Sequence, residues 1–260
     1  MTDSVTTDSG PKPYGLFGLI VTTILIVAGT AAIAMGAYFA AHYIGGHRLV
    51  ALMGNVGLYG TKTMHSAPAP VQHAFFVILA AGFVALLIPT VLAALWRGGR
   101  HWRGLLALNG PQRLPGFWWL VLFVLALPLY LIVASFTVRY FYPQFRTWFF
   151  VPRDWAGKLL SILPVVILAP LAEELFFRGW LYTSLRNSFR PSTAIAVTTI
   201  LFALAHSDGG LLYPAAVFIP GLVLALVREY TGSVLASFAV HALYNGWAWL
   251  LVLTLGRNLG

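Results

Sequence analysis

One segment of the sequence places charged side chains inside an otherwise apolar run. Glu173, Glu174 and Arg178 lie among alanines, leucines and phenylalanines between residues 169 and 179. A charged side chain at the centre of a bilayer costs at least ~2.5 kcal/mol, so a carboxylate at that depth is a candidate for a functional site. Because Glu174 and Arg178 are four residues apart, we expect them to pair along a helix, which leaves Glu173, about 100° away, free to face a cavity. Pro170 removes a backbone donor and should loosen or kink this helix.

Two histidines and an asparagine are predicted to lie near the depth of Glu173. A turn at residues 190–191 separates two apolar segments, and Glu173 stands about as far before this turn as His206 stands after it. In an antiparallel helical hairpin that rises ~1.5 Å per residue, these two side chains would face each other. His241 and Asn245 are four residues apart, on one face of the last apolar segment. The sequence thus predicts a site of one carboxylate, two imidazoles and one amide.

These residue types favour hydrolysis by an activated water. Glu173, desolvated at membrane depth, is the expected general base and would take a proton from a water held between it and His206. His241 and Asn245 are expected to donate hydrogen bonds to the oxyanion of a tetrahedral intermediate, a task for preorganised donors in a dry site. Phe202 stands one turn before His206 and is expected to form an apolar wall beside the imidazole.

Structural interpretations of the same residues stay open. Glu174 and Arg178 are expected to support the site, and a buried ion pair that only fixes helix packing would have the same spacing. A histidine or an asparagine in a membrane helix also forms hydrogen bonds between helices without taking part in chemistry. The placement of several such residues at one depth favours the catalytic interpretation.

A metal-dependent mechanism is the second open point. Glu173, His206 and His241 would supply three ligands to a zinc ion, with water in the fourth position. The sequence has no H-E-x-x-H helix, and a carboxylate with an imidazole activates water without a metal. We therefore expect no metal and no other cofactor, with zinc on these three residues as the alternative.

Composition predicts an all-α polytopic membrane protein. The chain has 260 residues, of which 59% are hydrophobic and 9% are charged, against roughly 25% charged in a soluble domain. A spanning helix needs about 20 apolar residues, and the sequence contains about seven such segments, with six to eight as the range. They are Tyr14–Tyr43, His73–Trp96, Phe117–Tyr140, Lys158–Leu185, Ser192–His206, Leu211–Val227 and Ser233–Leu255. We divide the chain into a tail (1–13), three N-terminal helices with their loops (14–157) and a catalytic core (158–257).

Charge and cysteine content limit the remaining possibilities. The net charge of +9 comes from basic residues between apolar segments, which predicts contact with membrane lipids and no nucleic-acid partner. The densest basic cluster, at residues 97–113, is placed in the cytoplasm by the positive-inside rule, together with the N-terminus. The absence of cysteine excludes disulfides, thiolate metal sites and a cysteine nucleophile. Short loops and the lack of a cleavable signal pattern suggest the inner membrane of a prokaryote.

The motifs resemble those of the CAAX-protease and bacteriocin-processing family of intramembrane endopeptidases, which includes the type II CAAX prenyl proteases. E-E-x-x-x-R occurs at residues 173–178, F-x-x-x-H at 202–206 and H-x-x-x-N at 241–245, in the order and spacing of that family. Each motif alone is weak, whereas three in order within a polytopic chain are specific. The resemblance covers roughly residues 158–255.

The resemblance implies a helical membrane endopeptidase. It assigns water activation to Glu173 and His206, the oxyanion to His241 and Asn245, and support to the neighbouring ion pair. Eukaryotic relatives remove the last three residues of prenylated C-a-a-X proteins, so the expected substrate is a membrane or lipidated peptide or protein, with prenylation left open. Two alternatives remain: a non-catalytic immunity or binding factor with the same fold, and a proton-coupled transporter, for which the sequence shows no internal repeat.

Overall fold

The computed structural model describes residues 16–45, 67–141, 151–152, 154–207 and 212–255, and within these ranges it contains helices and no strand. The predicted tail, residues 1–13, lies outside the described residues. The helices are α1 (Leu16–Gly45), α4 (Ala69–Gly98), the short α5 (Trp102–Leu105), α6 (Phe117–Phe141), a long helix described below, α10 (Pro191–Leu204), α11 (Leu212–Thr231) and α12 (Val234–Leu255).

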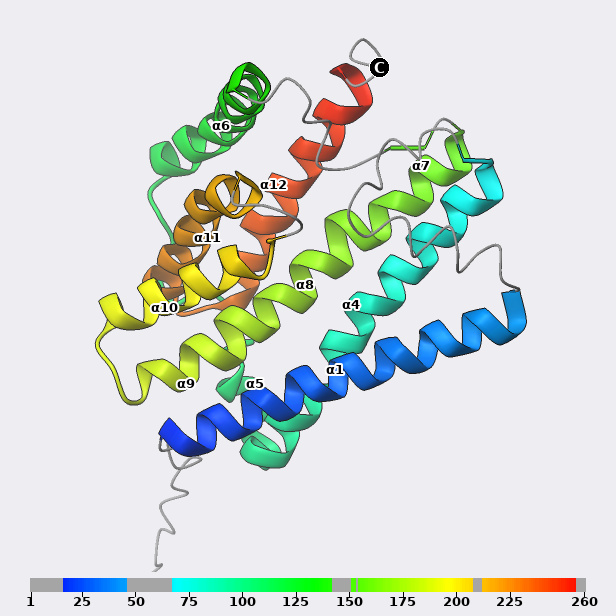
Figure 1. The fold of residues 1–260 in the computed structure, drawn as a ribbon. Helices are drawn as coiled ribbons and strands as arrows, with labels where there is room; N and C mark the ends of the chain where they lie inside the picture. The colour runs from blue at the N-terminus through cyan, green and yellow to red at the C-terminus, as the bar shows by residue number, and fades with distance from the viewer. Residues whose placement is uncertain (1–15, 46–66, 142–150, 153, 208–211, 256–260) are drawn as a thin grey trace, which may run out of the picture.

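The long helix runs from Trp155 to Arg186 and changes its hydrogen-bonding pattern along its length. Its parts are α7 (Trp155–Ile162), the π-helical η2 (Leu163–Leu168), α8 (Ala169–Glu174), the π-helical η3 (Leu175–Leu181) and α9 (Tyr182–Arg186). The helix lies in the middle of the bundle, between α1 and α4 on one side and α10, α11 and α12 on the other (Figure 1). It therefore contacts most of the other elements.

The all-α polytopic prediction is confirmed, and each of the seven predicted apolar segments corresponds to one helix. Among the described residues, five helices are long and apolar enough to cross a membrane: Leu16–Gly36, Ala69–Leu105, Trp155–Arg186, Tyr213–Thr231 and Val234–Thr254. The apolar helices Leu125–Ala134, within α6, and Pro191–Leu204 are shorter. The N-terminal end of α1 and the C-terminal end of α12 lie at opposite ends of the bundle (Figure 1).

Backbone hydrogen bonds tie the basic connection after α4 to the turn between α11 and α12. Val234 N donates to Ala107 O at 3.0 Å, and Gln112 N donates to Thr231 O at 2.8 Å. Gly232 occupies the left-handed region with φ of +69°, which a residue without a side chain adopts at little cost. These contacts hold the start of α12 and therefore the depth of the residues that follow it.

A proline inside α11 creates a contact with α6. Pro220 has no N–H, so the carbonyl four residues earlier, on Ala216, loses its helical donor. Tyr130 of α6 donates its hydroxyl to that carbonyl. Because an unpaired carbonyl is costly in an apolar environment, this bond anchors α6 to the core helices.

The long helix begins at a tightly packed corner next to α4. The Asp154 side chain caps α7 by accepting from Gly157 N at 2.9 Å, and both of its oxygens lie 2.8 Å from Nε2 of His73. A Cβ on Gly157 would lie 2.6 Å from Cβ of Pro152 and 2.9 Å from Asp154 Oδ1. Only glycine fits at this position without displacing the cap.

We expect Gly157→Ala to destabilise the protein by roughly 1–3 kcal/mol, as overpacking of a filled site does. The control is Gly82→Ala in α4, where an added Cβ meets nothing within 4 Å and the gain in helix propensity should leave stability equal or raised. Thermal unfolding of the detergent-solubilised protein, followed by tryptophan fluorescence, compares the two. Equal melting temperatures for both variants would contradict the packing.

Asp154 should make stability depend on acid pH. The hydrogen bond from His73, followed by the one from Gly157 N, holds the pKa of Asp154 below its ordinary value. The stabilisation is therefore fully present above the ordinary carboxyl pKa of ~3.9 and is lost as the pH falls through the lower folded-state pKa. Asp154→Asn keeps the cap without the charge. The melting-temperature advantage of the wild type over Asp154→Asn should disappear on acidification, and an advantage that persists would exclude this role.

Candidate active site

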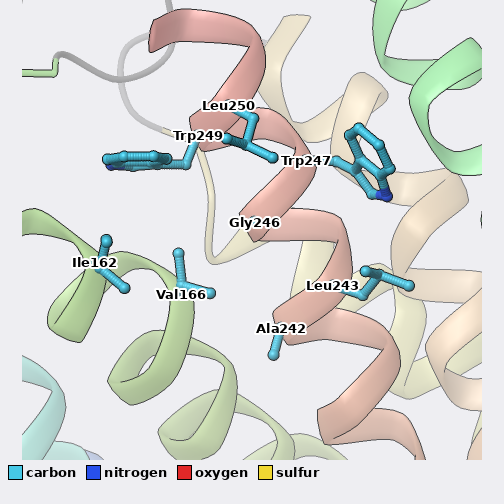
Figure 2. A pocket seen from close by; sticks show the side chains of 8 residues that line it. All are labelled: Ile162, Val166, Ala242, Leu243, Gly246, Trp247, Trp249 and Leu250. Atoms are coloured by element: carbon cyan, nitrogen blue, oxygen red, sulfur yellow. The ribbon is translucent and has the colours of Figure 1, made fainter.

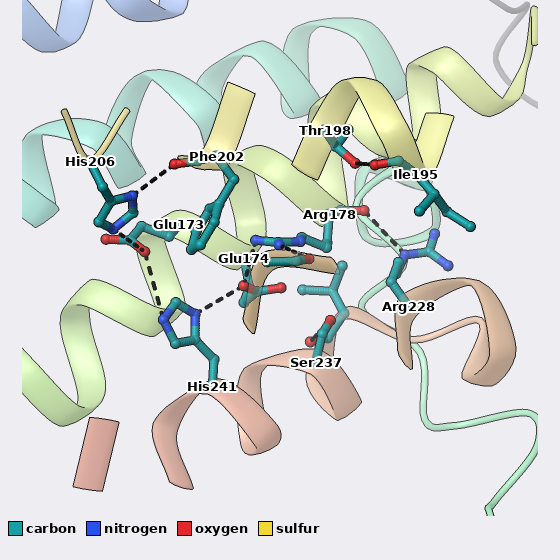
Figure 3. A network of polar contacts seen from close by, with 12 residues as sticks. Glu173, Glu174, Arg178, Ile195, Thr198, Phe202, His206, Arg228, Ser237 and His241 are labelled. Carbon is teal, nitrogen blue, oxygen red and sulfur yellow. Dashed lines mark hydrogen bonds and ion pairs between the residues drawn. The ribbon is translucent and has the colours of Figure 1, made fainter. Parts of the chain in front are cut away.

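Glu173 faces two histidines that come from two other elements. Its Oε2 lies 3.9 Å from Nε2 of His206, just after α10, and 3.8 Å from Nε2 of His241 on α12. The two imidazoles converge on this carboxylate (Figure 3). The structure thus brings together three of the residues that the sequence singles out, although they are up to 68 positions apart along the chain. Their catalytic roles remain predictions.

The distances around Glu173 suit a shared water. Both exceed the range of 2.7–3.2 Å that is typical of a direct hydrogen bond to a ring nitrogen, and a wider polar gap is commonly bridged by water. A water seated about 2.8 Å from Oε2 would be within reach of either imidazole. The Glu173 side chain is 14% exposed and that of His206 is 19% exposed, so the site is enclosed but open to small molecules.

The state of His206 follows from its backbone contact. Its Nδ1 lies 2.8 Å from Phe202 O, and because a carbonyl only accepts, Nδ1 carries the hydrogen. In the neutral ring, Nε2 therefore presents a lone pair toward Glu173. The ring of Phe202 packs against His206 with centroids 4.7 Å apart and against His241 at 5.8 Å. Phe202 thus forms the expected apolar wall.

The predicted pair Glu174–Arg178 is present and includes a third member. Arg178 Nη1 donates to Glu174 Oε1 at 2.9 Å, and both side chains have no exposed surface. Glu174 Oε1 also lies 3.0 Å from Nδ1 of His241. Because a carboxylate accepts, it holds the hydrogen of His241 on Nδ1 and turns Nε2 toward Glu173. His241 therefore lies between two adjacent carboxylates of one helix.

Arg178 connects the site to α11. Its Nη2 donates to Gly221 O at 2.8 Å, and its guanidinium carbon lies 4.3 Å from the centroid of the Phe202 ring. A Cβ at Gly221 would lie 2.9 Å from Cδ1 of Phe202, so the absence of a side chain allows this approach. The buried guanidinium of Arg178 therefore links the long helix to α11 through Gly221 and to α10 through Phe202.

Asn245 donates a hydrogen bond to the backbone of the long helix. Its Nδ2 donates to Val165 O at 2.9 Å. In η2, Ala169 N bonds to Pro164 O, five residues back. The next carbonyl in this register, on Val165, would need the N–H of residue 170, and Pro170 has none. One amide hydrogen of Asn245 supplies the missing donor, so an oxyanion role for Asn245 rests on its second N–H.

The helix continues through Pro170, and the segment directly before it, η2, has the wider π-helical register. The two π-helical segments η2 and η3 lie on either side of α8, which carries both carboxylates. Single π turns inside α-helices are frequently found at functional sites. Neither composition nor hydropathy indicates this register, and the prolines at positions 164 and 170 are the only local signal for η2.

Tyr213 is a further neighbour of the site that sequence reasoning missed. It lies in the first turn of α11, and its ring meets the ring of His206 edge-on with centroids 5.5 Å apart. The position carries no motif, and a single aromatic residue in an aromatic-rich chain gives no signal.

An apolar groove lies between the long helix and α12 (Figure 2). It has a volume of about 400 Å³. Ile162 and Val166 face α12 across it (Figure 2). The lining also includes Ala242 and Gly246, the residues that follow His241 and Asn245. The groove is therefore suited to hydrocarbon.

Comparison with known proteins identifies the segment that carries the site. Residues 155–247 match the family model described as Type II CAAX prenyl endopeptidase Rce1-like. An uncharacterized 24.3 kDa protein of Escherichia coli is 29% identical over 147 residues, which cover 55% of this chain and 67% of that protein. No solved structure matches significantly. With five helices of membrane length, this is an integral membrane protein. Residues 155–247, which contain all three motifs, are thus similar to the Type II CAAX prenyl endopeptidase Rce1-like family.

Proposed function

We propose that this protein is an intramembrane endopeptidase that hydrolyses peptide bonds with a water activated by Glu173 and His206. The similarity of residues 155–247 to a protease family supports hydrolysis in general. The observation that carries the specific mechanism is the convergence of two Nε2 atoms on Oε2 of Glu173, at 3.8 Å and 3.9 Å. This arrangement offers a base and two groups that orient the water.

The proposed reaction assigns one task to each side chain. Glu173 takes a proton from the water while the water oxygen attacks the scissile carbonyl, and it returns the proton to the leaving amine. His206 orients the water through Nε2. His241 donates from Nε2 to the oxyanion, assisted by the second amide hydrogen of Asn245. For that donation His241 must be an imidazolium, whose charge then balances the two carboxylates together with Arg178.

The substrate that fits best is a hydrophobic or lipid-modified protein segment. The groove between the long helix and α12 has an apolar lining that includes Ala242, the residue that follows His241. We therefore propose processing of a membrane-associated protein, with CAAX-type removal of a prenylated C-terminus as the specific form. A non-catalytic immunity or binding factor remains the alternative, and it requires no intact Glu173.

We also propose an orientation in the inner membrane of a prokaryote. Basic side chains gather at the end where α4 and α9 end, namely Arg97, Arg100, Arg103, Arg113, Arg186 and Arg190. The positive-inside rule places this end in the cytoplasm. The N-terminus of α1 lies at the same end (Figure 1), so it would also be cytoplasmic.

Substitution of the two adjacent glutamates should have different effects. Glu173→Gln removes the base and is expected to lower turnover at least ~100-fold while leaving the melting temperature near that of the wild type. Glu174→Gln leaves Arg178 buried without its counter-charge and should destabilise the fold by ~3–5 kcal/mol. Cleavage is measured with internally quenched hydrophobic peptides, each with and without a C-terminal farnesyl cysteine, and stability by thermal unfolding. Cleavage by Glu173→Gln at the wild-type rate would exclude the mechanism, and a wild type that cleaves none of the peptides would favour the non-catalytic alternative.

We propose that catalysis needs no metal ion, because a carboxylate and an imidazole suffice to activate water. The same peptide assay after dialysis against EDTA and 1,10-phenanthroline should show unchanged turnover. Metal content is measured in parallel by mass spectrometry on wild type and His206→Ala. Stoichiometric zinc that is lost in His206→Ala, with activity lost on chelation, would instead assign Glu173, His206 and His241 as its ligands.

A further inference from the structure

The end of each π-helical segment leaves one backbone carbonyl without a helical donor. Where a helix returns from i→i+5 to i→i+4 bonding, the register skips one carbonyl. In η2 the last such bond ends at Pro164 O, so the skipped carbonyl belongs to Val165, and Asn245 of α12 donates to it. An unpaired carbonyl at membrane depth costs several kcal/mol, so the donor is required by the π register.

The second π-helical segment shows the same relation with a different donor. Tyr182 N bonds to Phe177 O, five residues back, and the helix is α-helical from Tyr182 onward. The skipped carbonyl therefore belongs to Arg178. Arg228 of α11 donates to it from Nε at 3.1 Å (Figure 3). Arg228 thus has the same relation to η3 that Asn245 has to η2.

Arg228 spans the junction between η3 and α9. Its Nη2 donates to Oγ1 of Thr183 at 3.1 Å, and its guanidinium carbon lies 5.5 Å from the centroid of the Tyr182 ring. The residue is 9% exposed. A planar guanidinium reaches both oxygens at once, which a lysine ammonium on its single flexible stem does not reproduce.

The hydrogen bond from Arg228 to the backbone of Arg178 connects Arg228 to the proposed active site. α11 holds Arg178 at two points, since Gly221 O accepts from its guanidinium and Arg228 donates to its carbonyl. If η3 relaxed to α-helical bonding, the residues before it would rotate by about 100° relative to α9. Such a rotation would carry Glu173 away from the two imidazoles and break the alignment of Glu174 with His241.

We propose that Arg228 is a positioning residue for the active site, which holds η3 in its π register by satisfying the carbonyl of Arg178. The effect on turnover rests on the proposed peptidase function, whereas the effect on the backbone does not. Arg228 itself contacts neither the proposed water nor Glu173, so it acts through the helix.

The matched control is Arg186, a second arginine at the same end of the bundle. It lies on α9, donates to Glu229 at 3.2 Å and to Phe189 O at 3.1 Å, and is one third exposed. None of these partners is a carbonyl that the end of a π-helical segment leaves without a helical donor. Both Arg228→Lys and Arg186→Lys keep the net charge. Only Arg228→Lys removes the hydrogen bond to Arg178 O.

The primary measurement is amide hydrogen exchange of the full-length protein in nanodiscs, read by mass spectrometry. Arg228→Lys should increase exchange in peptides covering residues 175–185 by roughly tenfold, as expected for the loss of a charge-assisted hydrogen bond, and Arg186→Lys should not. If Arg228→Lys does not fold, Thr183→Val removes only the second partner and should raise exchange in the same peptides by less. Exchange at the wild-type level in the variant that folds would overturn the proposal.

Turnover supplies the second readout, with the same quenched peptides. Arg228→Lys should lower kcat about tenfold at unchanged KM, as misalignment of a preorganised group does, while Arg186→Lys keeps both values. An unchanged kcat in Arg228→Lys would overturn the positioning role. A wild-type preparation that cleaves none of the peptides would contradict the proposed function, and the exchange measurement would still decide the role of Arg228 in holding η3.

Discussion

The burial of the Glu174–Arg178 ion pair is the constraint on which the rest of the site depends. Both side chains are fully buried, and a charge in such surroundings is costly unless its counter-charge and its hydrogen bonds compensate for lost water. The pair cannot satisfy all of its own donors and acceptors. The guanidinium therefore also donates to α11, and the carboxylate also accepts from His241 of α12. This demand brings two further helices to the long helix and places His241 beside Glu173.

The same requirement applies to the backbone. π-helical segments and prolines leave carbonyls without helical donors, and an apolar bundle offers no water to replace them. Side chains from other helices supply these donors: Asn245 for Val165, Arg228 for Arg178 and Tyr130 for Ala216. Each irregularity in one helix thus becomes a directional contact with another. Hydrophobic packing alone would not fix the rotation of each helix about its own axis so closely, because it is not directional.

The two adjacent glutamates have different surroundings, and this difference is the reason for the different roles that we propose for them. Glu174 is buried, bonded to Arg178 and bonded to His241, so its oxygen Oε1 is already occupied. Glu173 is partly exposed, and its Oε2 stands just beyond direct hydrogen-bond distance from two imidazoles. His241 connects them, since one nitrogen is held by Glu174 and the other is presented to Glu173. The first carboxylate orients the ring that the second is proposed to use.

The sequence by itself determined the features that depend on composition and on fixed helical geometry. Seven apolar segments, the pairing of Glu174 with Arg178 and the approach of Glu173 to His206 all follow from hydropathy, 3.6 residues per turn and a constant rise per residue. Only the tertiary structure decided the π register, the bond from Asn245 to Val165 and the bond from Arg228 to the Arg178 carbonyl. Hydrogen-bond register leaves no trace in hydropathy, and these partners lie 50 to 80 residues apart in the chain. Their meeting depends on how helices rotate against one another, which local residue patterns do not specify.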